Sequence, residues 1–326
     1  MKFTVPVVLL LFKRRDAALR IIDRLRAAEV SKLYILADQG RNKAEREKVW
    51  ETRTAVEQAI DWDCEVIKDY AEENRGVYGN IALGAKWVFA REKWAIFLED
   101  DNLPELTFFP YCEELLKRYE EDQRVLWICG TNYLGRYQPD NKVSYMFTKH
   151  MLPCGWASWS DKFLKYYDGE AKALDDAWVE ERFVNDFPSK EMSDVYIAPL
   201  KKYRKALATG KNPASWDYQM CLSVRINSMY GISPVCNQIK NIGVDDNSEH
   251  GGNSMARIMT RRFCGMESYP LEFPLRHPKV VMTDLNYEKA VDKIVTPPFS
   301  MQLRHQIAKR IKKVIGMDEN RSLIRW

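Results

Sequence analysis

Hydrophobic residues near the start of the chain are grouped as a strand, a helix and a second strand. The run from Val5 to Phe12 is continuously apolar and has the length of a strand, so we expect it to be buried on both faces. From Ala17 to Ala28, apolar residues recur at helical spacing, and the segment from Leu33 to Ala37 is apolar again. A strand–helix–strand unit predicts two parallel strands.

The alternation of helical and strand patterns continues to residue 130. Helices are predicted over residues 43–60, 78–90 and 106–119, and strands over 64–67, 94–98 and 125–130. This order is typical of an α/β fold in which a mainly parallel, twisted sheet is flanked by helices. Ligands of such folds bind beyond the carboxyl ends of the strands, so functional residues are expected there.

Beyond residue 130 the pattern is irregular, and we expect a second half, residues 131–295, built on the same sheet as residues 1–130. The Pro-rich stretch from Tyr269 to Pro298 predicts an extended connection. Residues 296–326 form a separate unit in this prediction, a basic amphipathic helix with Leu303, Ile307 and Ile311 at steps of four. Such a helix either lies on an anionic membrane surface or packs on the body with a solvated basic face.

The charge of the chain is concentrated in this last segment. The formal net charge is +4, but residues 302–326 hold seven Lys and Arg against Asp318 and Glu319. That segment alone is therefore +5, and the remaining residues sum to −1. A body without excess positive charge argues against nucleic acid as a partner.

The cysteines and the first apolar run of the sequence indicate the cellular compartment of the protein. Seven cysteines form no CxxC pair and are odd in number, which favours free thiols over a disulfide framework or a structural zinc site. The first apolar run is too short to span a bilayer, and its positive charges follow it rather than precede it, unlike a signal peptide. We expect a cytoplasmic protein.

Three adjacent acids, Glu99, Asp100 and Asp101, directly follow the predicted strand 94–98. Neighbouring carboxylates repel one another unless a cation compensates them, so the triplet is suited to hold a divalent ion on nucleotide phosphates. The pairs Asp175-Asp176 and Asp245-Asp246 also occur, but neither follows a strand of the alternating region. The alternative interpretation is a solvated turn.

The segment FLEDDNLPELTFFPYCEELLKRY around this triplet resembles the metal-binding region of GT-A glycosyltransferases. The segments VLWICGTN, LPCGWASW and SWDYQM follow in the order and approximate spacing seen in the N-acetylglucosaminyltransferase I-like group and its bacterial relatives. The opening LLLFKRRDAALRIIDRL and the segment YILADQG also resemble that group. The resemblance covers most of residues 5–250 and implies the GT-A (nucleotide-diphospho-sugar transferase) fold.

The resemblance assigns roles on the donor side. Asp101 matches the acid that binds Mn²⁺ or Mg²⁺, while Glu99 and Asp100 match acids that face the donor sugar and ribose. Arg14 matches an arginine that reaches the pyrophosphate or base, although Arg15 is an alternative one position away. Two further matches are Asp38, at a position that contacts uracil, and Arg75, in the loop Asn74-Arg75-Gly76 that closes over the nucleotide; a helix cap and a surface turn are their structural alternatives.

The resemblance also assigns roles to residues on the acceptor side. Asp217, in SWDYQ, matches the catalytic base of inverting enzymes, and its alternative role is the N-cap of a following helix. Gly155 and Trp156 match a turn that lines the sugar pocket, with the ring offering a stacking face. His250 matches a late histidine that touches the metal, and Tyr218 replaces the second acid of the animal enzymes.

The sequence therefore predicts a metal-dependent glycosyltransferase that transfers a sugar from a UDP-sugar to a carbohydrate or lipid-linked saccharide in surface polysaccharide synthesis. Peripheral contact with the inner membrane through the terminal helix is part of this prediction. A sugar nucleotidyltransferase is one alternative, although residues 12–16 lack the glycines of its signature loop. The other alternative is an inactive carbohydrate-binding protein, against which the intact acids argue.

Overall fold

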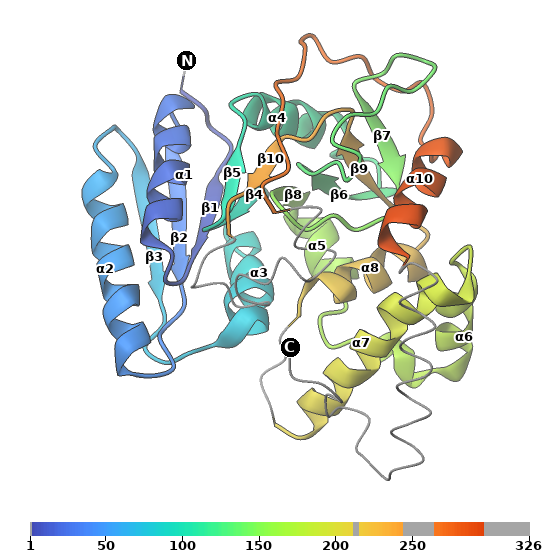
Figure 1. The fold of residues 1–326 in the computed structure, drawn as a ribbon, viewed down its shortest axis with the longest axis horizontal. Helices are drawn as coiled ribbons and strands as arrows, with labels where there is room; N and C mark the ends of the chain where they lie inside the picture. Colours follow the sequence, from blue (N-terminus) through green and yellow to red (C-terminus); the bar gives the residue numbers. More distant parts are fainter. Residues whose placement is uncertain (1, 211–214, 244–263, 297–326) are drawn as a thin grey trace.

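The computed structural model describes residues 2–210, 215–243 and 264–296. In this part of the chain, one sheet has the strand order β3-β2-β1-β4-β8-β6-β9-β7 (Figure 1). The strands of this sheet are β1 (Val7–Leu11), β2 (Lys32–Ala37), β3 (Glu65–Tyr70), β4 (Trp94–Glu99), β6 (Val125–Cys129), β7 (Tyr145–Thr148), β8 (Trp156–Trp159) and β9 (Tyr230–Pro234). Strands β7 and β8 run against the others, which share one direction. The predicted α/β class with a mainly parallel sheet is confirmed.

The elements of the first half agree with the periodicity of the sequence. Every residue of β1 is buried, and Leu10 lies between Leu36 of β2 and Glu99 of β4. The helices of this half are α1 (Arg15–Ala27), α2 (Lys43–Ala59), α3 (Gly84–Phe89) and α4 (Phe108–Arg118). A π-helical turn, Tyr78–Leu83, precedes α3, so the single helix predicted over 78–90 consists of two parts.

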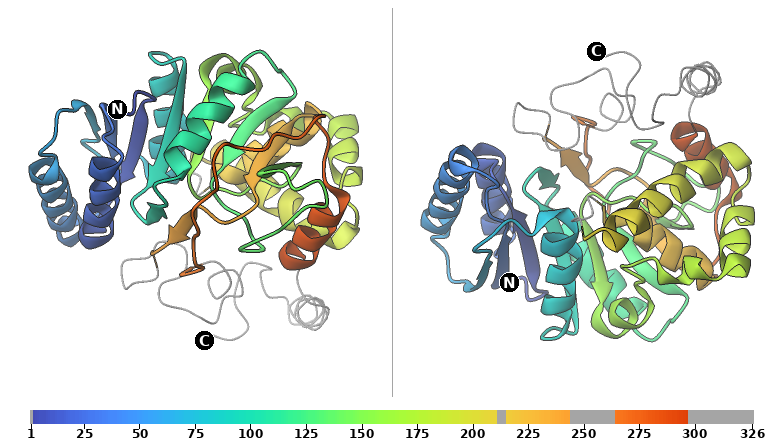
Figure 2. Two further views of the ribbon diagram at one scale, coloured as in Figure 1. Left: turned by 90° about the horizontal axis from the view of Figure 1, so that it is seen from above. Right: turned by 90° about the horizontal axis from the view of Figure 1, so that it is seen from below.

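The second half adds helices to the same sheet. These are α5 (Ser160–Tyr166), a 3₁₀ turn (Lys172–Asp175), α6 (Ala177–Asn185), α7 (Lys190–Ala208) and α8 (Asp217–Ile226). Helices α6, α7 and α8 form a group at the end of the molecule away from α1 and α2 (Figure 2). A separate two-stranded sheet pairs β5 (Asn102–Pro104) with β10 (Ile239–Asn241). This small sheet begins directly after the acidic triplet.

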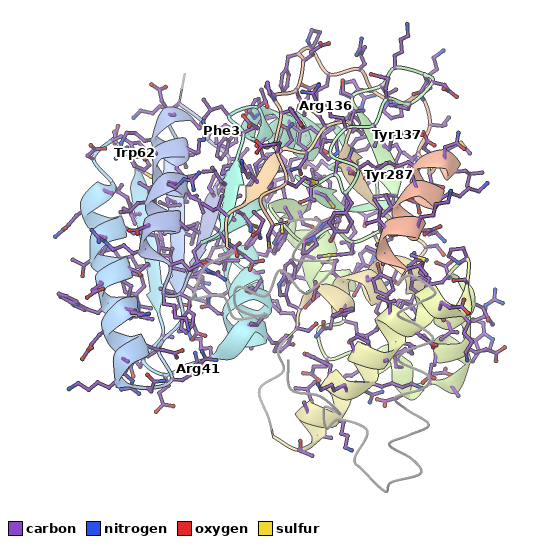
Figure 3. The ribbon with its side chains drawn as sticks, viewed as in Figure 1. Phe3, Arg41, Trp62, Arg136, Tyr137 and Tyr287 are labelled. Carbon is purple, nitrogen blue, oxygen red and sulfur yellow. The ribbon has the colours of Figure 1, made fainter. Side chains whose placement is uncertain are left out.

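Helix α10 (Leu285–Val295) corrects the prediction of an extended connection over 269–298. The carboxylate of Asp284 accepts hydrogen bonds from the backbone N–H groups of Asn286 and Tyr287, which stabilises the start of the helix. Tyr287 is buried, its hydroxyl lies 2.7 Å from Ser233 Oγ, and its ring lies beside that of Tyr137 (Figure 3). Packing on β9 therefore stabilises α10, although the prolines on either side of it predicted an extended segment.

Buried apolar residues form one layer on each face of the sheet. One layer contains the inward side chains of α1 and α4, and the other contains those of α3, α7 and α8. Among the residues described, no helix is both long enough and apolar enough to cross a membrane. The predicted terminal helix, residues 296–326, lies outside the described residues except for Thr296, and the predicted domain limits stay predictions.

Candidate active site

Asp100 is held by the loop that follows β1. The backbone N–H of Phe12 donates to Asp100 Oδ2 at 3.0 Å, and Arg14 Nη1 donates to Asp100 Oδ1 at 2.8 Å. Arg14 is the N-cap residue of α1 and faces the acidic triplet, whereas Arg15 is the exposed first residue of that helix. Of the two arginines considered from the sequence, Arg14 is the one that contacts the triplet.

Asp101 lies where Arg14, Asn102 and the segment 242–243 meet. Arg14 Nη1 is 3.2 Å from Asp101 Oδ2, and Asn102 Nδ2 donates to Asp101 Oδ1 at 2.5 Å. The backbone N–H of Ile242 donates to the carbonyl oxygen of Asp101 at 2.8 Å. A Cβ at Gly243 would lie 2.3 Å from Asp101 Oδ2, so this close approach requires glycine.

The acids of the triplet act on one another electrostatically. Burial raises the pKa of Glu99 well above its ordinary value, and the charges of Asp101 and Asp100 raise it further. Burial also raises the pKa of Asp100 to about 6, while the positive charge of Arg14 opposes this shift. The guanidinium of Arg14 pairs with Asp100 and Asp101 and lowers the pKa of Glu99 by its charge, so three carboxyl groups lie around one cation. A divalent cation would compensate this excess of negative charge.

Asp217 is the first residue of α8, and its half-buried side chain accepts a hydrogen bond from Ser215 Oγ at 3.2 Å. The N-cap position belongs to Trp216, so the alternative role of Asp217 as the cap residue is not found. The charge of Asp217 is the last of the effects that raise the pKa of Glu99, after burial and the acids at 101 and 100. Asp217 therefore contributes to the raised pKa of Glu99, although the two residues lie over a hundred positions apart in the chain.

Asp38, directly after β2, holds the loop that contains Arg75. Its carboxylate accepts hydrogen bonds from the backbone N–H groups of Gln39, Arg75 and Gly76 and from the side chain of Asn74, at 2.7 to 3.0 Å. The guanidinium of Arg75 pairs through both terminal nitrogens with Asp69, at 2.6 and 2.8 Å. The two predicted nucleotide contacts thus lie together, with Asp38 positioning the loop.

Gly155 and Trp156 have different environments although they are adjacent. Gly155 has a φ of +62°, and its N–H donates to Asn102 Oδ1 at 2.8 Å, so it belongs to the turn beside the triplet. The ring of Trp156 is 1% exposed and is stacked between Phe97 and Trp127, with ring centroids 3.9 and 4.3 Å away. We correct the prediction for Trp156, because neither face of its ring is open to a sugar.

The carboxylate oxygens of the triplet are suitable ligands for a hard divalent cation. Mg²⁺ and Mn²⁺ prefer oxygen ligands, and Mg²⁺ is commonly held by one or two carboxylates together with substrate phosphates. Among the described residues, no group of three or more His, Cys, Asp or Glu side chains is arranged to hold a metal ion by itself. Asp101 is the described residue that would contribute a ligand, and the other predicted ligand, His250, lies outside the described residues.

Asn102 is a site residue that the sequence did not reveal. Its side chain is 1% exposed and connects Asp101 with the backbone of Gly155. An asparagine after an acidic run suggests an ordinary turn, and the contact with Gly155, 53 positions later, has no local signal. The dipeptide Asp101-Asn102 thus fixes the sheet edge to the Gly155 turn.

No protein-family model and no curated protein matches the sequence. Glucosyl-3-phosphoglycerate synthase from Mycobacterium tuberculosis, solved with Mn²⁺, UDP and glucosyl-3-phosphoglycerate, is similar at 12% identity and a TM-score of 0.30, over 48% of this chain and 57% of that chain. A UDP-glucose pyrophosphorylase complexed with UDP-glucose is similar at 9% identity and a TM-score of 0.37, over 74% and 93%. HddC from Yersinia pseudotuberculosis, complexed with GMP-PN, is similar at 11% identity and a TM-score of 0.31, over 50% and 80%.

The chain spans little more than half the length of the synthase that it matches. None of these three structures is an N-acetylglucosaminyltransferase, so the resemblance to that group stays a prediction. At such TM-scores the similarities carry no argument about activity. The function proposed below therefore depends on the residues of the site.

Proposed function

We propose that the protein is a metal-dependent glycosyltransferase that transfers a sugar from a UDP-sugar to a hydroxyl of a carbohydrate or glycolipid acceptor, with inversion at the anomeric carbon. The observation that carries the proposal is the acidic triplet at the end of β4, where Asp100 and Asp101 lie against the guanidinium of Arg14. Inverting transfer needs one carboxylate for the acceptor proton and a separate cluster for the diphosphate. Asp217 and the triplet supply these two parts.

In the proposed step, the acceptor oxygen forms a bond to the anomeric carbon while its proton passes to a carboxylate oxygen of Asp217. The bond between the anomeric carbon and the β-phosphate oxygen breaks, and UDP leaves with that electron pair. A divalent cation bound at Asp101 would stabilise the negative charge of the departing diphosphate. Arg14 lies beside the same carboxylates and adds a fixed positive charge on the donor side.

The substrate-binding roles in this proposal follow the resemblance. Glu99 and Asp100 face the donor sugar and ribose, Asp38 and Arg75 lie beside the nucleoside, and Gly155 lets the backbone approach the sugar. The acceptor is a saccharide of surface polysaccharide synthesis, and the basic terminal segment would bring the enzyme to the inner membrane face. A coupled assay of UDP release, run with a panel of UDP-sugars with and without Mn²⁺, tests the reaction class directly.

The role of Asp217 has its own test. Asp217→Asn should lower kcat by about 10²–10⁴-fold, because general base catalysis contributes that much, while UDP affinity in Mn²⁺ stays near the wild-type value. Asp161→Asn is a matched control, since Asp161 is an exposed acid in the first turn of α5. Near wild-type turnover in Asp217→Asn would overturn the assignment of the base. UDP-sugar consumption only together with pyrophosphate, with release of UTP and a sugar 1-phosphate, would instead favour a nucleotidyltransferase.

A further inference from the structure

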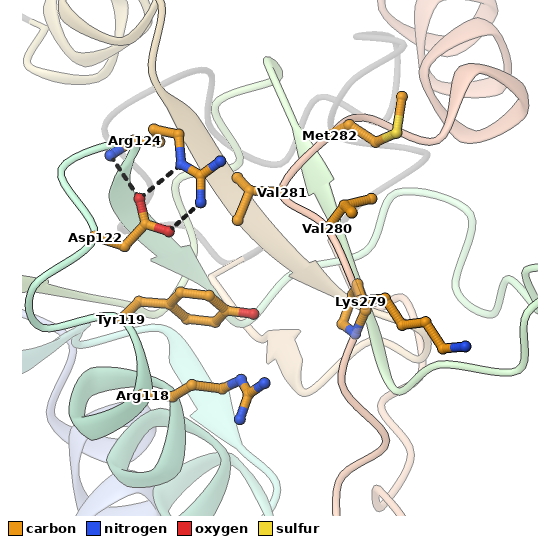
Figure 4. Close-up of a pocket in the computed structure, with 9 residues that line it drawn as sticks. Arg118, Tyr119, Asp122, Arg124, Lys279, Val280, Val281 and Met282 are labelled. Carbon is orange, nitrogen blue, oxygen red and sulfur yellow. Dashed lines mark hydrogen bonds and ion pairs between the residues drawn. The ribbon is translucent and has the colours of Figure 1, made fainter.

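A pocket lies at the end of the strands opposite to the acidic triplet. It has a volume of about 420 Å³ and lies between the end of α4, the turn before β6 and the segment 278–282 (Figure 4). Strands β4 and β6 run in the same direction, and the pocket adjoins the start of β6, whereas the triplet ends β4. The proposed transferase chemistry therefore does not use this pocket.

A chain of hydrogen bonds runs from the pocket into the protein. The hydroxyl of Tyr119, a lining residue, lies 2.6 Å from the hydroxyl of Tyr145, which lies 3.0 Å from His277 Nδ1. His277 Nε2 is in turn 3.0 Å from Glu114 Oε1. These residues come from α4, β7 and the segment before the pocket, so the chain connects three separate parts of the fold.

These hydrogen bonds all run in one direction, from donor to acceptor, when His277 is neutral. Nε2–H donates to the carboxylate of Glu114, which leaves Nδ1 as an acceptor for the hydroxyl of Tyr145. Tyr145 then accepts from Tyr119. Burial lowers the pKa of His277, and the charge of Arg118 lowers it further, which favours this neutral form at neutral pH.

Arg118 lies beside the ring of Tyr119, with its guanidinium carbon 5.8 Å from the ring centroid. Burial lowers the pKa of Arg118, but the neighbouring phenols of Tyr119 and Tyr145 raise it overall. The side chain of Arg118 is exposed and lines the pocket beside this ring. An arginine guanidinium is well suited to bind oxyanions.

The charges around the pocket are unequal. Arg124 forms a two-pronged ion pair with Asp122, at 2.9 and 2.7 Å, and is neutralised by it. Within the part of the chain that the structure describes, no carboxylate pairs with Arg118 or with Lys279 on the opposite wall. The negative end of the α4 dipole explains a cation at 118 but not one at 279, which belongs to a different segment.

We propose that this pocket binds a phosphate group, with Arg118 as its main ligand, Tyr119 positioning that arginine, and Lys279 adding charge from the facing wall. Val281 and Met282 give the pocket an apolar side, so the phosphate belongs to a ligand with an apolar portion next to it. A phosphorylated small molecule and a lipid headgroup share this chemistry. The proposal does not depend on the transferase activity.

Titration of the protein with inorganic phosphate, followed by ³¹P line broadening at constant ionic strength with EDTA, tests the site. Arg118→Met should weaken binding about tenfold and Lys279→Met about threefold, because one removes a direct charged hydrogen bond and the other a more distant charge. Lys117→Met is the matched control, since Lys117 has the same charge on the same helical turn but pairs with Glu113 outside the pocket. Equal phosphate affinity in wild type, Arg118→Met and Lys279→Met would overturn the proposal.

Lys279 is exposed, so Lys279→Met keeps the test valid even if Arg118→Met perturbs folding. Tyr145→Phe interrupts the hydrogen-bond chain and retains every charge, so a drop in phosphate affinity there supports the positioning role. Binding of glycerol phosphate, without sedimentation on phosphatidylglycerol vesicles, would identify a small ligand. Sedimentation on those vesicles that is lost in Arg118→Met would identify a lipid headgroup.

Discussion

Asn102 donates to Asp101 with its side-chain nitrogen, at 2.5 Å, and accepts from the backbone of Gly155 with its side-chain oxygen, at 2.8 Å. The amide therefore fixes one oxygen of Asp101 relative to the turn that faces the proposed donor sugar. Partners of this kind orient a ligand without touching the metal, and their loss typically lowers metal affinity 10–100-fold. The position of the carboxylate that is proposed to bind the metal thus depends in part on this buried side chain.

Asn102→Ala should raise the Mn²⁺ concentration for half-maximal UDP binding by about 10–100-fold. It should also lower the free energy of unfolding by about 1–3 kcal/mol, because the N–H of Gly155 is left without its acceptor. Calorimetric titration of UDP at several Mn²⁺ concentrations and urea unfolding measure the two effects. Asn227→Ala, at an exposed position after α8, is the control, and unchanged metal dependence in Asn102→Ala would contradict the role of the amide.

Gly155→Ala should destabilise the protein by two separate effects. Its φ of +62° strains any other residue, and an added Cβ would lie 2.5 Å from Ile239 Cδ1. Gly135→Ala separates these effects, because Gly135 has a φ of +71° but no atom within 4 Å of the added Cβ. We expect about 1 kcal/mol for Gly135→Ala and about 2–4 kcal/mol for Gly155→Ala by urea unfolding. Equal losses would show that Ile239 moves aside without cost.

Glu45→Gln should alter the acid stability of the protein. Hydrogen bonds from Arg41, and then from Lys13, hold the pKa of Glu45 below its ordinary value although burial opposes them. The folded state therefore binds the proton less readily than the unfolded chain, and the stabilisation is complete above the unfolded pKa of about 4.5. It is lost as the pH falls below that value towards the folded pKa.

Urea unfolding from pH 7 down to pH 3 measures this dependence. The variant should be about 1–2 kcal/mol less stable than the wild type at pH 7, and the difference should shrink as the pH falls below about 4.5. Glu51→Gln, at an exposed position of the same helix, should show little difference at any pH. A difference between Glu45→Gln and wild type that is independent of pH would argue for a packing effect instead.

The sequence predicted the first half of the fold well and the second half poorly. Strands β1, β2 and β4 are mostly buried, β3 is partly exposed, and helices of clear periodicity separate the four strands, so each local pattern has one interpretation. Strands β7 and β8 have only four residues each, and their pairing with distant strands leaves no local pattern. Helix α10 was missed because the prolines around it outweighed its cap residue, Asp284.

For the site, the sequence located acids better than aromatic rings. Three carboxylates at the end of a buried strand need compensation wherever the chain places them, so Glu99 to Asp101 could be predicted. Trp156 is buried by Phe97 and Trp127, which lie on other strands. A local sequence motif does not predict burial by residues that are distant in the sequence. The effect of Asp217 on the pKa of Glu99 has no local signal, because the two residues lie far apart in the chain.

The continuous sheet from β3 to β7 limits how the molecule can move. Strand β8 is hydrogen-bonded to β4 on one side and to β6 on the other, so the two halves of the chain share one backbone ladder. A bend between the halves would break main-chain hydrogen bonds that are shielded from water, at a cost for each unpaired group. A substrate would therefore reach the carboxylates of Glu99, Asp100 and Asp101 by movement of loops rather than of the sheet. The distances between these three carboxylates should be the same before and after the substrate binds.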